Sequence, residues 1–423
     1  MEVSLDSSRQ FDSRVGDAGN KGEQHLSGII EYLTIALLIL SYNTVWTRTP
    51  DVYSYASWIK LLACLVASII PLWLTLRHPS AKLSVGYFAV SGLGFCASFF
   101  VGHNLESSII AFVPVLLGLL YADSMYDVCR LRTFLSRFVN VVCVLAGISL
   151  FFFVFGSVLA FVAPTGSVSF NWETDRVTRS FYSLYYEAQA INFFGYSGAR
   201  NTGVFTEAPM FNFVLCLALL SNTVFTKGNA AKSILLVATI LSTFSTTGYF
   251  VIALVVVHAL FLSKSNSKII SALKYISIPI VVGVGIYALF LLFGTKSDTG
   301  SYGVRSDHLI GCVNLFFSTF PFGTGFGNDD AFYAVFSYDQ GLSIGVMYLL
   351  AQGGIFSLIL YGGPTVSALI AALRSRNFSY LLFQLAFFWL VFLTQVTTQP
   401  MFWIFVFLLA KYQYLSTDAD RAD

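Results

Sequence analysis

Residues 139–163 read VNVVCVLAGISLFFFVFGSVLAFVA, a run of 25 residues without a charged side chain. An α-helix rises about 1.5 Å per residue, so this run can cross the roughly 30 Å hydrocarbon core of a membrane. Arg130, Arg132 and Arg137 precede the run, and an aromatic segment with few basic residues follows it. Because cytoplasmic loops are enriched in Lys and Arg, the run predicts a transmembrane helix that leads out of the cytoplasm.

The same pattern repeats along the whole chain. Its 423 residues are 56% hydrophobic and 11% charged, whereas soluble domains carry about 25% charged residues. This deficit excludes an ordinary water-soluble enzyme, and nucleic acid binding is not expected because no basic stripe exists. We therefore predict an all-α polytopic integral membrane protein with about 12 transmembrane helices. The expected spans are approximately 28–46, 57–76, 83–101, 107–122, 139–163, 207–226, 232–247, 249–263, 275–295, 343–372, 378–397 and 400–415.

The basic residues predict the orientation of these spans. With the N-terminus inside, the inner segments hold 17 of the 24 Lys and Arg residues, a strong positive-inside signal. Both termini are then cytoplasmic, with residues 1–27 as a disordered tail, 28–415 as a single transmembrane domain and 416–423 as a second tail. Two long loops, about 164–207 and 296–343, face outward.

The first outer loop is rich in aromatic residues, and residues 176–194 have spacing that predicts an interfacial amphipathic helix. An aromatic belt at the lipid headgroups accounts for many of these rings. Trp172, Tyr182 and Tyr186 are the candidates for stacking against the apolar faces of sugar rings.

The first loop ends in RNTGVFTEAP, residues 200–209. Pro209 suits the first turn of the next helix, so Glu207 would lie at a helix N-terminus, where a carboxylate is stabilised. Glu207 is either a capping carboxylate or a functional one. For Arg200 we favour a functional role over a purely interfacial one.

The second outer loop places a cation, a carboxylate and a titratable base close together in Arg305, Asp307 and His308. Arginine suits fork-like binding of phosphate. The run PFGTGFG at 321–327 brings the backbone close to another group or turns tightly. It is not a Walker loop, because the Gly-Lys-Ser/Thr end is missing.

Three stretches together resemble the O-antigen polymerase and ligase superfamily, the membrane glycosyltransferases of bacterial surface polysaccharide. They are RNTGVFTEAPMF at 200–211, the Ser/Thr-rich turn LSTFSTTGYF at 241–250, and Arg305 followed by PFGTGFG at 321–327 and QGG at 352–354. Their order and spacing cover roughly residues 195–360. Members of the ligase branch carry a His about eleven residues before the Gly-Gly pair, where this chain has Ser343, so the resemblance favours the polymerase branch.

The resemblance implies a C-type glycosyltransferase-like fold and an inverting, metal-independent transferase without a cofactor. The implied substrates are undecaprenyl-diphosphate-linked oligosaccharides, as donor and as acceptor, at the outer face of the bacterial cytoplasmic membrane. A flippase and a chain-length regulator are the expected protein partners, and membrane lipid surrounds the chain. The product, whether O-antigen, capsule or exopolysaccharide, stays open.

Within that mechanism we assign the cations to the diphosphate and the carboxylates to the acceptor hydroxyl. Glu207, or Asp307 with His308, would orient or deprotonate the hydroxyl, and Trp172, Tyr182 and Tyr186 would contact sugar. The alternatives are a polysaccharide flippase or transporter, and an O-antigen ligase. Arg200 and Arg305 are expected to bind the diphosphate, with Arg176 or Arg179 assisting.

Overall fold

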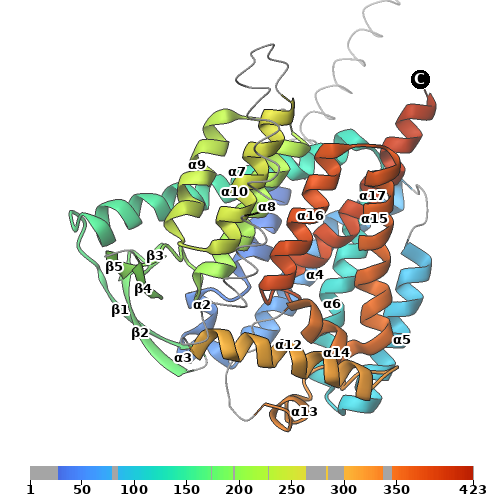
Figure 1. Cartoon of the computed structure of the whole chain (residues 1–423), viewed down its shortest axis with the longest axis horizontal. Helices are drawn as coiled ribbons and strands as arrows, with labels where there is room; N and C mark the ends of the chain where they lie inside the picture. The colour runs from blue at the N-terminus through green and yellow to red at the C-terminus, as the bar shows by residue number, and fades with distance from the viewer. Residues whose placement is uncertain are drawn as a thin grey trace, which may run out of the picture.

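The structure is a computed structural model (Figure 1). It describes residues 27–78, 84–172, 174–193, 196–226, 228–262, 283, 300–336 and 345–422. The expected span at 275–295 and most of the expected N-terminal tail lie outside the described residues.

Apolar helices dominate the described chain. Five helical stretches are long and apolar enough to cross a membrane. They are α4 (Ala56–Arg77), α5 (Ser84–Gly102), α6 (Leu105–Ser124), α7 (Val128–Phe152) continued by η1 (Phe153–Val158), and α14 (Gly345–Ser357) continued by η3 (Leu358–Gly362) and α15 (Gly363–Arg374). Shorter apolar helices are Ser27–Leu40, α8 (Ala208–Val224), α9 (Ala230–Ser242), α10 (Thr246–Leu262), α16 (Phe378–Leu393) and α17 (Pro400–Ala422). The described chain is therefore mostly helical, with five helical stretches that could cross a membrane, which is consistent with the expected all-α membrane protein in its coarse form.

The core lies around α8, α6 and α17. Residues 210–222 of α8 are all buried, so this helix is apolar and enclosed on every side, as expected of a central helix. The helix α17 continues to Ala422, so the segment from residue 416 that we expected as a second tail extends this helix.

Gly353-Gly354 and Gly362-Gly363-Pro364 predict a kink within the span expected at 343–372, and the helical stretch 345–374 is broken at the first of these pairs. Gly354 has φ 53° and ψ −133°, outside the helical region, and the π-helix η3 follows. The 321–327 run docks onto this break: Thr324 N donates to Ala351 O at 2.9 Å, and Ile355 N donates to Pro321 O at 2.8 Å. The glycine-rich run therefore brings the backbone close to another part of this chain.

The first outer segment corrects the expected amphipathic helix. It forms the antiparallel strands β1 (Gly166–Trp172), β2 (Thr174–Phe181) and β3 (Tyr185–Tyr186), and a hairpin of β4 (Ala190–Phe193) and β5 (Tyr196–Ala199). Along β2, Val177 and Arg179 are exposed whereas Thr178 and Ser180 are buried. This alternation with period two is the signature of a half-buried strand, and it competes with the helical spacing that we had read from the aromatic residues.

The second outer segment is also more ordered than the loop that we expected. It contains α12 (Gly300–Ser318) and the short α13 (Asp329–Tyr333). Figure 1 shows α12 lying crosswise at the lower end of the bundle, at the same end as the strands and the short helices α2 (Val45–Arg48) and α3 (Pro50–Tyr53). We call this the sheet end, and the end that carries the α8–α9 connection the opposite end.

Candidate functional site

A cavity of about 440 Å³ opens at the sheet end, where four parts of the chain meet. Its walls come from the segment after the first helix, the start of α4, the end of β1 with the segment before α8, and the segment after α16. The residues that line it are Tyr42, Asn43, Arg48, Tyr53, Lys60, Asn171, Trp172, Gln189, Arg200, Glu207, Pro209, Met210, Leu393, Thr394, Gln395 and Thr398.

Arg48 stands between aromatic rings at one wall of this sheet-end cavity. Its Cζ lies 5.1 Å from the ring centre of Trp172 and 5.3 Å from that of Tyr53. Its Nη2 donates to Asn43 Oδ1 at 2.9 Å. The two ring contacts and the hydrogen bond limit the motion of the guanidinium, which reduces the entropy lost when it binds an anion.

Lys60 supplies a second cation from the first turns of α4. Its Nζ lies 4.7 Å from the ring centre of Tyr42. The Tyr42 hydroxyl makes a hydrogen bond with Thr398 Oγ1.

Arg200 is held by the turn between α9 and α10. Its Nε donates to Thr243 O at 2.9 Å, and its Nη2 donates to Phe244 O at 3.4 Å. Asn201 N donates to Ser242 O at 3.0 Å and Asn201 Nδ2 to Ser242 Oγ at 2.9 Å. The 200–211 and 241–250 stretches, which lie about 40 residues apart in the sequence, thus meet in space.

Glu207 precedes α8, as Pro209 indicates, but its side chain makes no capping hydrogen bond to that helix. Gln189 performs the capping instead: its Oε1 accepts from Ala208 N at 3.0 Å, while its Nε2 donates to Glu207 Oε1 at 3.4 Å. A helix begins with unpaired N–H groups that need an acceptor, and Gln189 meets one of them. Glu207 therefore occupies the N-cap position without a capping hydrogen bond from its side chain, and its carboxylate lines the cavity.

The described lining residues include three cationic side chains, Arg48, Lys60 and Arg200, and one carboxylate, Glu207. Their formal charges sum to +2. A cavity of this size, with convergent polar groups and an excess of positive charge, suits an anionic ligand that carries more than one negative charge.

Of the residues predicted from the sequence, Trp172, Arg200 and Glu207 meet in this cavity. Arg176, Arg179, Tyr182 and Tyr186 are not among its lining residues. Arg179 is exposed and lies 3.7 Å from Glu187. Tyr186 is buried against Val45 and Phe170, so its ring supports the sheet and presents no face to a sugar. Tyr182 is exposed in the turn after β2.

The predicted cluster in the second outer segment lies on α12. His308 is buried, with its ring centre 4.9 Å from that of Phe336, and Asp307 is exposed. Neither residue lines the sheet-end cavity. The side chain of Arg305 lies outside the described residues, so Arg305 is not assigned to this site.

Sequence reasoning had not assigned Arg48, Lys60, Tyr42 or Gln189 to the site. Arg48, Lys60 and Arg200 all belong to the seven Lys and Arg residues that the sequence predicts outside the inner segments. The small size of this set is the signal that could have identified Arg48 and Lys60. Gln189 carries no such signal, because its role depends on the position of the α8 N-terminus.

Within the described residues, no group of three His, Cys, Asp or Glu side chains is arranged to hold a metal ion. A scan against protein-family models gives no match for this chain, and a search of curated proteins likewise finds no matching relative.

Proposed function

We propose that this chain is a membrane polysaccharide polymerase that transfers a growing glycan from polyprenyl diphosphate to a lipid-linked repeat unit. One observation carries the proposal: the sheet-end cavity joins Arg48, Lys60 and Arg200 to a single carboxylate, Glu207, beside the Trp172 ring. This is the set of groups that a diphosphate leaving group and a hydroxyl acceptor require. The resemblance noted in the sequence names the substrate class.

The three cations bind the diphosphate of the donor. As the bond between the sugar C1 and the diphosphate oxygen breaks, negative charge grows on that oxygen, and fixed cations stabilise it. The Thr243 and Phe244 carbonyls orient the Arg200 guanidinium before the donor arrives. Such preorganisation lowers the reorganisation needed in the transition state.

Glu207 receives the proton of the acceptor hydroxyl. The acceptor oxygen forms the new bond to C1 on the face opposite the leaving diphosphate, which inverts the configuration at that carbon. Gln189 caps the helix N-terminus, and the Glu207 carboxylate lines the cavity beside it. Trp172 offers an apolar ring to a sugar face, next to the Arg48 cation.

A transporter would need ionisable groups along a path through the membrane. The described buried ionisable side chains of the helices include Glu31, Asp123, His258, His308 and Lys411. Glu31, Asp123 and His258 lie near the ends of their helices that are remote from the sheet-end cavity. This distribution supports the transferase over the flippase, and Ser343 supports polymerase over ligase.

We further propose twelve spans with both termini cytoplasmic, so that the sheet end faces outward. Cysteine replaces Val177, which is exposed on β2, or Arg374, which is exposed at the end of α15, after exchange of the exposed native Cys96 and Cys129 for Ser. An impermeant thiol reagent added to intact spheroplasts should label V177C and not R374C. Labelling of R374C from outside contradicts the orientation.

The function is tested by the lipid-linked glycans of cells that lack this protein. Accumulation of single repeat units on lipid supports polymerase activity. Full-length chains left on lipid would identify a ligase, and repeat units that stay on the inner leaflet would identify a flippase. Purified protein supplied with lipid-linked repeat units should then make chains of more than one repeat.

A further inference from the structure

A second and larger cavity, about 790 Å³, lies at the opposite end of the bundle from the site described above. It lies between the first turns of α7, the end of α8, the start of α9 and the first helix. The 17 residues of α8 separate the two cavities, a distance of about 25 Å at the α-helical rise. The residues that line it are Tyr32, Arg132, Thr133, Ser136, Arg137, Asn222, Val224, Phe225, Thr226, Gly228, Asn229 and Lys232.

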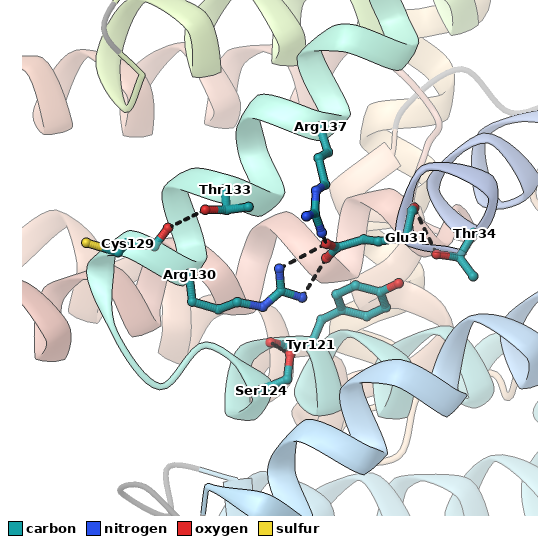
Figure 2. A network of polar contacts seen from close by, with 8 residues as sticks. All are labelled: Glu31, Thr34, Tyr121, Ser124, Cys129, Arg130, Thr133 and Arg137. Atoms are coloured by element: carbon teal, nitrogen blue, oxygen red, sulfur yellow. Dashed lines mark hydrogen bonds and ion pairs between the residues drawn. The ribbon is translucent and has the colours of Figure 1, made fainter. Parts of the chain in front are cut away.

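An ion-pair cluster stands at the edge of this opposite-end cavity (Figure 2). Arg130 and Arg137 of α7 both reach Glu31 of the first helix. Arg130 donates to the two carboxylate oxygens of Glu31 at 2.9 and 2.6 Å, and Glu31 is 1% exposed. One carboxylate thus faces two guanidiniums, which leaves a formal charge of +1 and holds the lining residue Arg137 in place.

Lys232 and Arg132 add two further cations. Lys232 Nζ donates to Asn140 Oδ1 at 2.6 Å, and Asn140 Nδ2 donates to the Tyr32 hydroxyl at 2.8 Å. Arg132 is exposed at the mouth. Across the described part of the chain, neither Arg132 nor Lys232 forms an ion pair with a carboxylate.

The described lining residues of this cavity include three cations and no carboxylate. With Arg130 and Glu31 counted, the formal charge around it is +3. Like charges gathered in a partly enclosed space repel each other, and an anion placed among them removes that cost. The hydroxyls of Tyr32, Thr133 and Ser136 also line the space and can donate to anion oxygens.

We propose that the opposite-end cavity binds a phosphate-bearing anion. The Arg137 guanidinium held by Glu31, the exposed Arg132 guanidinium, an ammonium and several hydroxyls are donors that recognise phosphate oxygens. The phosphate belongs either to the headgroup of an anionic phospholipid or to a soluble phosphate compound, since both present the same oxygens. Basic pockets between membrane helices on the cytoplasmic side bind anionic headgroups in this way. The site is separate from the sheet-end cavity and does not rest on the proposed transferase activity.

The test measures binding to the purified full-length protein in detergent by native mass spectrometry. The probes are dioctanoyl phosphatidylglycerol, dioctanoyl phosphatidylcholine and glycerol 3-phosphate. The variants are Arg132→Gln, and Arg132→Gln combined with Lys232→Gln, which leave the Glu31 cluster intact. Arg374→Gln is the matched control, because Arg374 is an exposed cation of α15 that does not line the cavity.

Phosphatidylglycerol should bind the wild-type protein more tightly than phosphatidylcholine. Each cation removed should weaken its binding about fivefold, so the double variant loses about 25-fold, and the control binds as the wild type does. Competition by glycerol 3-phosphate would identify a soluble phosphate as a sufficient ligand, and its absence would identify the lipid. Equal binding of phosphatidylglycerol to the wild type and to both cavity variants, or equal binding of the two lipids to the wild type, overturns the proposal. The single variant keeps the Lys232–Asn140 hydrogen bond, so it remains a test if the double variant does not fold.

Discussion

Glu207→Gln removes one negative charge from the sheet-end cavity with almost no change in shape. The glutamine can still accept from Gln189 Nε2, and Gln189 Oε1 still accepts from Ala208 N, so the start of α8 keeps its cap. The substitution therefore separates the chemistry of the carboxylate from its contribution to folding.

The two effects differ in size. The Gln189–Glu207 hydrogen bond is 3.4 Å long, beyond the usual range of about 2.7–3.2 Å, so its loss or change costs little. Loss of a negative charge at a helix N-terminus costs about 0.3–1 kcal/mol. A general base contributes about 10²–10⁴ in rate, equivalent to about 2.7–5.5 kcal/mol of transition-state stabilisation.

The assay follows the initial rate of chain extension by purified protein with lipid-linked repeat units, together with its thermal unfolding in detergent. We expect the rate to fall at least about 100-fold while the unfolding temperature changes little. Glu187→Gln is the matched control, because Glu187 lies near Arg179 and does not line the cavity. This variant should extend chains at the wild-type rate. A wild-type rate in Glu207→Gln would refute Glu207 as the base.

Arg200→Ala should lower the rate of chain extension about 10²–10³-fold, because a cation that stabilises the leaving diphosphate is lost. Arg200→Lys should retain only part of the wild-type rate, because Lys lacks the fork of N–H groups that donates to the Thr243 and Phe244 carbonyls. Wild-type chain lengths in both variants would remove Arg200 from the mechanism. Gly325→Ala should destabilise the protein by about 2 kcal/mol or more, because φ is 81° and an added Cβ would lie 2.6 Å from Gly102 N. Its control is Gly92→Ala, where an added Cβ meets no atom of another part of the chain within 4 Å and the unfolding temperature should not fall. Chain extension should persist in excess EDTA, since the cations of the cavity supply the positive charge; loss of the rate, restored by Mg²⁺ or Mn²⁺, would assign that work to a metal.

The sequence was least informative about the two outer segments. Residues 176–194 carry both helical and alternating spacing, and the choice of strands depends on which side chains find a buried surface. Phe170 and Tyr186 find it against Val45, which comes from a different part of the chain. The register of a strand is specified by such burial, so local periodicity alone misassigned this segment.

The residues of the candidate site also divide into those with a local sequence signal and those whose place depends on tertiary packing. Arg200 and Glu207 were recognisable because they are a scarce cation and a scarce carboxylate next to a helix start marked by Pro209. The exclusion of Tyr186 from the cavity, and of His308 on α12, depends on packing against Phe170 and Phe336. Burial of a ring against partners distant in sequence is a tertiary property.

By itself, the sequence determined that this is a helical membrane protein, because the length and hydropathy of an apolar run are local quantities that set its free energy of transfer into lipid. It also showed the break at Gly354, because a glycine pair within an apolar run is a local signal. Only the tertiary structure decided that Arg48, Lys60, Arg200 and Glu207 line one cavity. Their convergence depends on long-range packing of α4, α8 and the β1 strand, and no local pattern encodes which distant side chains will meet.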